Sequence, residues 1–121
     1  MNRRQLAERR GLRAERVVAC WLRLTGWRVL LRRYRTPVGE IDLIARRGRT
    51  LAIIEVKARE ELGAAFDAVP PSSRRRIERA TAYYLAGHPQ WGKFSPRFDL
   101  IVVRPWRLPR HVKDAWRPDG I

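Results

Sequence analysis

Two short groups of charged residues interrupt segments of this sequence that are otherwise apolar. Glu40 and Asp42 are two residues apart, and so are Glu55 and Lys57, which follow the apolar run Leu51–Ile54. On an extended strand, residues two apart point to the same face. Charged side chains rarely occupy strand positions with apolar neighbours unless they bind or catalyse. These four residues are therefore the first candidates for a functional site.

A basic turn, Arg47-Gly48-Arg49, separates the two groups and fixes how their strands would pair. If Gly48 and Arg49 form a two-residue hairpin loop, Arg47 pairs with Thr50. A loop one residue longer would move the carboxylates to different faces. Counting back from the two-residue loop predicts the pairs Ile44–Ile53, Asp42–Glu55 and Glu40–Lys57. Apolar then faces apolar, and the charges gather on one face.

The gathered residue types indicate phosphodiester chemistry. Opposed carboxylates about 5 Å apart repel each other, so one takes up a proton or a cation lies between them. Ligands that are all oxygen favour Mg²⁺ or Mn²⁺, and such ions activate water and stabilise the phosphate under attack. Lys57, beside Glu55, would supply a positive charge to that phosphate. Asp42, Glu55 and Lys57 are thus the predicted catalytic residues.

The alternative reading is that Glu55–Lys57 and Glu40–Lys57 are cross-strand ion pairs on a solvated sheet edge. Apolar residues run directly into Glu55 and surround Asp42, whereas the residues of solvated strands alternate. The apolar flanks favour a site over a solvated edge.

Composition limits the class of protein. The 121 residues suit one domain, and the net charge of +15 predicts a surface that attracts nucleic acid, unless the arginine excess reflects genome composition. No segment is apolar enough to span a membrane, and no Cys or His residues have zinc spacing. The single Cys20, between apolar neighbours, is predicted to fill the core in a reducing compartment, so we expect a cytoplasmic protein.

Periodicity and turn residues predict the elements that position these groups. The tail is mostly irregular, with a short edge strand or turn at 111–115. A loop covers 59–72, and Ser72 or Ser73 caps the helix that follows it. We expect one helix over 2–25 and a second that follows this cap and runs to about residue 86. Strands are expected over 27–34, 40–46, 50–58 and 97–104. The order αβββαβ predicts an α/β fold with a mixed sheet flanked by helices.

Other residues are weaker candidates when taken alone. Glu15 lies beside the apolar stripe of the first helix and would by default be a surface carboxylate. Asp99, inside the last strand, would pair locally or approach the site. Arginines on the two helices could contact a phosphate backbone or form solvated faces. They include Arg13, Arg16, Arg74, Arg75, Arg76 and Arg79. Three tryptophans, Trp91, Trp106 and Trp116, could stack on bases, although packing is the commoner role.

The ordered set of motifs resembles the YraN family of small bacterial proteins, which belongs to the restriction-endonuclease-like superfamily near archaeal Holliday-junction resolvases. The resemblance covers nearly the whole chain. It depends on Gly11 with Ala14-Glu15, Gly39–Ile44, Ile54–Arg59, Ala80 with Tyr84-Leu85, Arg97-Phe98-Asp99 and His111–Trp116. Ser73-Arg74 stands where relatives usually have Lys-Gln, so one polar contact to substrate differs.

The resemblance implies a restriction-endonuclease-like nuclease core that depends on Mg²⁺. Asp42 and Glu55 match the metal ligands of the superfamily, Lys57 matches its catalytic lysine, and Glu15 matches an acidic residue that the first helix adds to the metal site. Arg59, which ends the Ile54–Arg59 motif, is a further candidate for nucleic-acid binding, and Glu40 and Asp99 are secondary candidates. A DNA endonuclease acting on branched or junction DNA, as a homodimer, is the leading hypothesis. A nucleic-acid-binding protein without catalysis, or a scaffold for an acidic protein partner, remains open.

Overall fold

A five-stranded mixed sheet lies between two helices in the computed structural model, which describes residues 1–60 and 69–118. The sheet order is β1-β2-β3-β4-β5. The elements are α1 (Arg3–Leu24), β1 (Arg28–Thr36), β2 (Gly39–Arg47), β3 (Thr50–Ala58), α3 (Pro71–Gly87), a 3₁₀ turn η1 (Pro89–Trp91), β4 (Ser95–Val103) and β5 (Arg110–Trp116). The predicted α/β fold and element order are confirmed, and β5 is a full edge strand.

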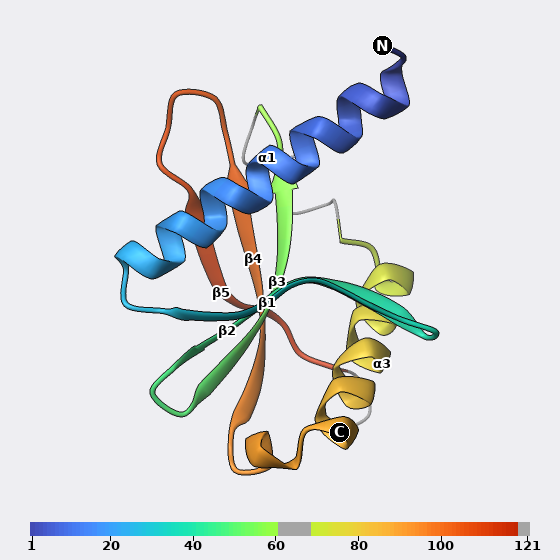
Figure 1. The fold of residues 1–121 in the computed structure, drawn as a ribbon, viewed down its shortest axis with the longest axis vertical. Helices are drawn as coiled ribbons and strands as arrows, with labels where there is room; N and C mark the ends of the chain where they lie inside the picture. The colour runs from blue at the N-terminus through green and yellow to red at the C-terminus, as the bar shows by residue number, and fades with distance from the viewer. Residues whose placement is uncertain (61–68, 119–121) are drawn as a thin grey trace.

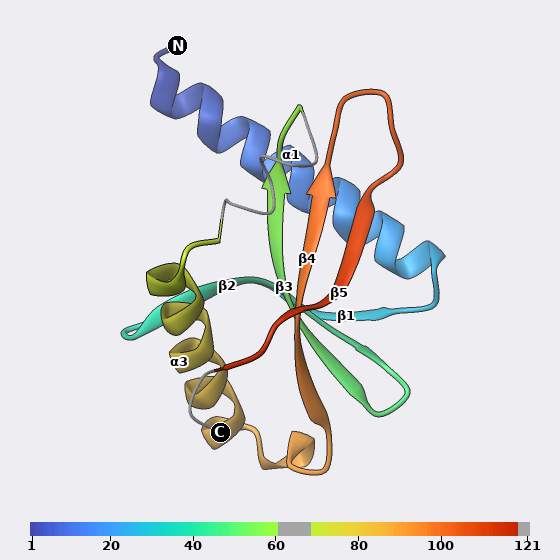
Figure 2. The same ribbon diagram turned by 180° about the vertical axis from the view of Figure 1, so that it is seen from behind.

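The strand pairing explains the position of α3. Neighbouring strands are antiparallel except for β3 and β4, which are parallel, and α3 belongs to the connection between them. A parallel pair needs such a crossover. Figure 1 shows α1 crossing one face of the sheet, and Figure 2, from behind, shows α3 beside the β1–β2 hairpin on the other side.

Each helix buries an apolar stripe against its own face of the sheet. Strand residues alternate between the two stripes, so adjacent positions on β3 and β4 face different helices. The α1 face includes Ala14, Val18, Leu22, Leu43, Ile54, Val56 and Ile101. The α3 face includes Ile77, Ala80, Tyr84, Ile44, Ile53, Leu100 and Trp116. β4 is thus covered on both sides, as its continuous apolar sequence predicts.

The helix ends agree with the sequence for α1 and differ for α3. Asn2 and Gln5 form a reciprocal capping box at the start of α1. The prediction that Ser72 or Ser73 caps the second helix is wrong: Pro70 is the cap residue, without a side-chain hydrogen bond, and Pro71 is the first helical residue. Proline suits that position because its missing N–H would have no partner within the helix.

The structure contradicts the expectation for Cys20 and tests the loop predicted at 59–72 only in part. Cys20 is exposed, contrary to the predicted core position, because the buried stripe of α1 passes through Val18, Ala19 and Leu22. The predicted loop at 59–72 falls partly outside the described residues, since 61–68 are not among them. Within the described parts of the chain, no helix is long and apolar enough to cross a membrane.

Candidate active site

The β2–β3 hairpin has the predicted register near its turn and opens farther away. Arg47 pairs with Thr50 and Ile44 with Ile53, as expected, and the ladder ends at Leu43 and Ile54. The predicted pairs Asp42–Glu55 and Glu40–Lys57 lie beyond that end. Figure 1 shows the far end of the β1–β2 hairpin turning away from β3 toward α3.

Asp42 bridges the gap where the two strands separate. Its Oδ2 accepts a 2.8 Å hydrogen bond from the backbone N–H of Val56. That amide therefore has a side-chain carboxylate as its partner at the point where the β2–β3 ladder has ended. The bond fixes the orientation of Asp42 and joins the two halves of the candidate site.

A glycine allows the opened hairpin to reach α3. A Cβ atom on Gly39 would collide with the backbone carbonyl of Arg76. Gly39 is itself buried, so the start of β2 lies directly against the helix. Any side chain at this position would push the hairpin away from α3 and with it Asp42, three residues along the strand.

The separated strands and both helices enclose a cavity of about 290 Å³. α1 contributes Glu15 to its lining, β2 contributes Glu40 and Asp42, β3 contributes Glu55 and Lys57, and α3 contributes Ser73 and Arg76. We call this space the carboxylate cavity. Glu55 and Lys57 share one face of β3 because Val56 between them packs in the α1 core. All four residues predicted for catalysis or metal binding therefore line one cavity.

Glu15 is the residue whose environment departs most from its local sequence. It is only 8% exposed, and its Oε2 atom is buried without a hydrogen-bond partner among the described residues. Arg33 Nε lies 3.7 Å away, an ion pair too long for a hydrogen bond. Burial raises the pKa of Glu15, nearby Asp42 raises it further, and Arg33 opposes both effects. The default reading, a surface carboxylate paired to a nearby arginine, is wrong about exposure, whereas the pair with an arginine is present.

Sequence reasoning missed Arg33, which approaches Glu15 from β1. Its φ of 53° is in the left-handed region, uncommon for a residue other than glycine. Arg33 also lines a smaller hollow of about 70 Å³ together with Glu15, Glu40 and Asp42. Nothing in the local sequence, where Arg32, Arg33 and Arg35 are alike, marks this arginine.

The surroundings of Glu55 favour its protonated form. Burial is the largest cause, and a hydrogen bond and charge repulsion from Asp42 add to it, so that the pKa of Glu55 rises to about 9 despite the opposing effect of Lys57. Glu40 contributes slightly in the same direction, although it is exposed and forms an ion pair with Arg35 at 3.8 Å. Asp42 and Glu55 thus form a close carboxyl pair that a cation would relieve.

The ligand atoms of the carboxylate cavity are of the type that a hard divalent cation prefers, but fewer than three of the described side chains there are grouped closely enough to hold one. These atoms are carboxylate oxygens, and Glu15, which has one oxygen without a hydrogen-bond partner among the described residues, lines the same cavity. Among residues 1–60 and 69–118, however, no three His, Cys, Asp or Glu side chains are grouped so that they could hold a metal ion. Mg²⁺ commonly takes one or two carboxylates and fills its other positions with water and phosphate. Asp42 and Glu55 meet that requirement.

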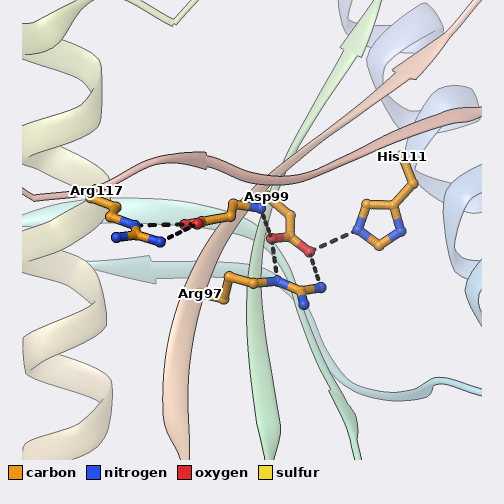
Figure 3. Close-up of polar contacts among 5 residues, drawn as sticks. Arg97, Asp99, His111 and Arg117 are labelled. Carbon is orange, nitrogen blue, oxygen red and sulfur yellow. Dashed lines mark hydrogen bonds and ion pairs between the residues drawn. The ribbon is translucent and has the colours of Figure 1, made fainter.

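Asp99 does not join the carboxylate cavity. It is fully buried on the α1 side of β4, forms an ion pair with Arg97 at 2.9 Å and is hydrogen-bonded to Nε2 of His111 at 2.7 Å. The backbone N–H of Asp114 donates a further hydrogen bond of 3.0 Å (Figure 3). Burial raises the pKa of Asp99, but the hydrogen bonds from His111, Arg97 and Asp114 outweigh it and hold that pKa below its ordinary value. The expectation of local pairing fits Arg97; the contact with His111 on β5 is long-range.

The predicted nucleic-acid-binding arginines divide into four groups. Arg74 is engaged in the fold, because its Nε donates to the Val69 carbonyl and its guanidinium lies over Trp116. Arg76 lines the carboxylate cavity. Arg59 lines an adjoining groove and bonds to its neighbour's carbonyl. The rest are exposed on the helices: Arg13, Arg16, Arg75 and Arg79.

Comparison with solved structures defines the class of fold. The structure is similar to that of Hjc, a Holliday junction resolvase from Archaeoglobus fulgidus, with a TM-score of 0.57 and 20% sequence identity. The match covers 84% of this chain and 73% of the resolvase chain. The mixed sheet flanked by helices is thus the resolvase fold, as the resemblance predicted.

Comparison with known sequences identifies the family. Residues 14–103 match the family described as "Uncharacterised protein family UPF0102", and this chain belongs to it. A UPF0102 protein of Parvibaculum lavamentivorans is 53% identical over 93% of this chain and 84% of its own length. Another, from Agrobacterium fabrum, is 51% identical over 95% of this chain and 94% of its own length. The predicted membership of the YraN family is confirmed.

Proposed function

We propose that this protein is a metal-dependent endonuclease that hydrolyses phosphodiester bonds in DNA, including branched or junction DNA. The observation that carries the proposal is the carboxylate cavity, where Glu15, Asp42, Glu55 and Lys57 meet from three different elements. The printed title of the similar Archaeoglobus protein, a Holliday junction resolvase, supports the choice of substrate class.

Some residues of the cavity would bind the metal ion in such a reaction, and others would bind phosphate. The Val56 amide fixes Asp42, and Glu55 lies close enough for the two carboxyls to repel and share a proton. Together with Glu15 they would hold Mg²⁺ or Mn²⁺, which when bound supplies charge stabilisation at the phosphate and a more acidic water. Lys57 would donate to a non-bridging phosphate oxygen, and Arg76 would bind an adjacent phosphate.

An adjoining groove extends the positive surface beyond the cavity. This groove, of about 480 Å³, shares Gly11, Val56 and Lys57 with the cavity and is also lined by Arg3, Arg10 and Arg59. Arginines along a groove suit a phosphate backbone that is held without base readout. A homodimer, which would present two cavities to two strands, belongs to the same proposal.

The decisive experiment is incubation of the purified protein with junction, flap and linear DNA, with Mg²⁺ or Mn²⁺ and with chelator. We expect Asp42→Asn and Lys57→Ala to lower the cleavage rate by at least about 100-fold, as removal of a group that stabilises transition-state charge does. Glu15→Gln tests the third acid. Its matched control on the same helix is Glu8→Gln, which changes an exposed carboxylate, and exposed Lys93→Ala controls for Lys57→Ala.

The control variants should cleave within about twofold of wild type, because exposed substitutions of this kind change little. Cleavage that survives both Asp42→Asn and Lys57→Ala would come from a contaminating nuclease and would contradict the proposal. So would failure to cleave any of the three DNAs with either ion.

A nucleic-acid-binding protein without catalysis is the second candidate. The observation in its favour is that the described residues form no ready group of three metal ligands. This candidate predicts binding that weakens steeply with salt and does not need a divalent ion. Binding without cleavage under every ion condition would select it.

A further inference from the structure

Trp106 lies in the loop between β4 and β5 and differs from the other tryptophans of the chain. Its side chain is fully exposed. Trp91 packs edge-on against Phe94 at 5.0 Å, and Trp116 stacks on Phe98 at 5.3 Å, so packing accounts for both. It does not account for Trp106, the one member of that predicted trio left without a structural role.

The backbone of Trp106 adds to the anomaly. Its φ is 60°, in the left-handed region, where a bulky residue is an outlier. An exposed indole in a strained turn gains nothing from burial, and Leu108 two residues later is also exposed. Such a feature indicates a binding role, because the exposed indole belongs to the loop that joins the paired strands β4 and β5.

A cavity of about 620 Å³ between this loop and α1 indicates the chemistry of the ligand. Trp106 and Pro105 supply apolar surface, and α1 supplies Ala14 and Val17. Among residues 1–60 and 69–118, four arginines and one acid, Glu60, also line it: Arg10, Arg13, Arg59 and Arg104. The Nε atom of Arg104 is buried without a hydrogen-bond partner in the described part of the chain. A ligand with a flat apolar ring and an anionic group matches this lining.

The cavity beside the β4–β5 loop is connected to the carboxylate cavity through the groove along α1. It shares Arg10, Ala58 and Arg59 with the groove along α1, and that groove shares Lys57 with the carboxylate cavity. One polyanionic strand could therefore occupy all three hollows, with arginines along its phosphates. Charge complementarity thus favours a nucleic-acid strand over a protein segment as the occupant.

We propose that the Trp106 indole stacks on an unpaired base of a nucleic-acid strand whose phosphates follow this path to the carboxylate cavity. This inference rests on the proposed function, since it names the form of nucleic acid that the same surface selects. Bases in a duplex are already stacked on their neighbours, so Trp106 would favour single-stranded or unpaired regions over paired DNA.

Equilibrium binding tests this proposal without cleavage. The probes, in chelator, are a labelled oligothymidylate, the same strand with abasic sites, and a blunt duplex of equal length. Trp106→Ala should weaken oligothymidylate binding by roughly tenfold, the size expected for one base–aromatic stack. Trp106→Phe should retain part of the affinity. The matched control is Leu108→Ala, which removes an exposed apolar side chain from the same loop and should change affinity less than twofold.

Two comparisons complete the test. Abasic sites should weaken wild-type binding and leave Trp106→Ala nearly unaffected, and duplex affinity should be the same for both proteins. Equal oligothymidylate binding by wild type and Trp106→Ala overturns this inference, while cleavage that needs Lys57 leaves the proposed function standing. An equal loss for all probes, together with a change of oligomeric state in sedimentation, would make Trp106 a subunit contact and also overturn it. A wild-type protein that binds none of the probes also overturns the inference, whereas the cleavage assay with Mg²⁺ or Mn²⁺ and Lys57→Ala decides the proposed function separately.

Discussion

Asp99 and Glu55 lie on adjacent parallel strands at almost the same level and have opposite environments. Asp99 pairs with Ile54 across the β3–β4 ladder, and Glu55 is the next residue of β3, facing the other side of the sheet. Asp99 receives hydrogen bonds from an arginine, a histidine and a backbone amide. Glu55 faces another carboxylate, and its neighbour Glu15 has a buried oxygen without a partner.

The contrast separates an acid that has partners within the fold from an acid that faces another acid. Partners lower the pKa of Asp99 although it is fully buried, whereas burial and Asp42 raise the pKa of Glu55 to about 9. A protein that buries a charge usually provides its partners, and a site that leaves acids unpaired has them available for a ligand. The sheet thus carries a fully hydrogen-bonded acid, Asp99, on one face, and acids that lack such partners, Glu55 and Glu15, line the cavity beside it.

The largest effect on stability should come from removing the charge of Asp99, which the hydrogen bonds of Arg97 and His111 stabilise. Asp99→Asn should lower the free energy of unfolding by about 3–5 kcal/mol, because breaking one partner of a buried pair leaves Arg97 and His111 uncompensated. Urea unfolding measures this change. Asp114→Asn is the matched control: it removes an exposed carboxylate but keeps the backbone N–H that bonds Asp99, and should cost under about 1 kcal/mol.

The pH dependence sharpens the same prediction. Because the folded-state pKa of Asp99 is depressed, its contribution is present above the ordinary value of 3.8 and disappears as pH falls through the lower folded value. Wild type should therefore lose stability in that acidic range, while Asp99→Asn should show a flatter acid limb. Parallel acid limbs would show that Asp99 is not the group that titrates.

Local patterns predicted the parts of the site that depend on neighbouring residues. The Gly48-Arg49 turn and strand alternation gave the register from Arg47–Thr50 to Ile44–Ile53 and placed Glu55 and Lys57 on one face. Beyond Leu43 the strands separate, and no pattern in the sequence marks that point. The separation depends on the contact of Gly39 with α3, which is distant in sequence.

Tertiary packing decided the residues that sequence could not place. Glu15 is buried because β1 brings Arg33 over it, and Asp99 is neutralised by His111 twelve positions later on a strand whose existence was uncertain from sequence. Cys20 and Trp106 are exposed despite apolar character, because Cys20 lies off the buried stripe of α1 and Trp106 lies in the loop between β4 and β5. Such features need contacts between distant segments.

Removing the charge repulsion between Asp42 and Glu55 should stabilise the metal-free protein. Glu55→Gln mimics the protonated acid, so at pH 8 it should raise the free energy of unfolding by roughly 1–3 kcal/mol. The sign follows from the raised pKa: wild type binds the extra proton only when folded, so its stability falls as pH rises from 4.5 to about 9. The variant should lack that decline, and the two proteins should converge near pH 4. Glu40→Gln, which changes an exposed acid on the same cavity, should alter the wild-type decline only slightly, because Glu40 is the smallest of the causes that raise the pKa of Glu55.

The smallest effect should be stabilisation by the divalent ion itself. Mg²⁺ at about five times its dissociation constant should raise the free energy of unfolding by about 1 kcal/mol, since it binds only the folded protein. Binding must displace the proton from Glu55, so the stabilisation should grow between pH 6 and pH 9, and protons should be released into a weak buffer. Asp42→Asn should abolish both effects, whereas Asp114→Asn should keep them. If Asp42→Asn responds to Mg²⁺ as wild type does, or if NaCl of equal ionic strength reproduces the shift, the ion acts through general screening and the unpaired acids are not its site.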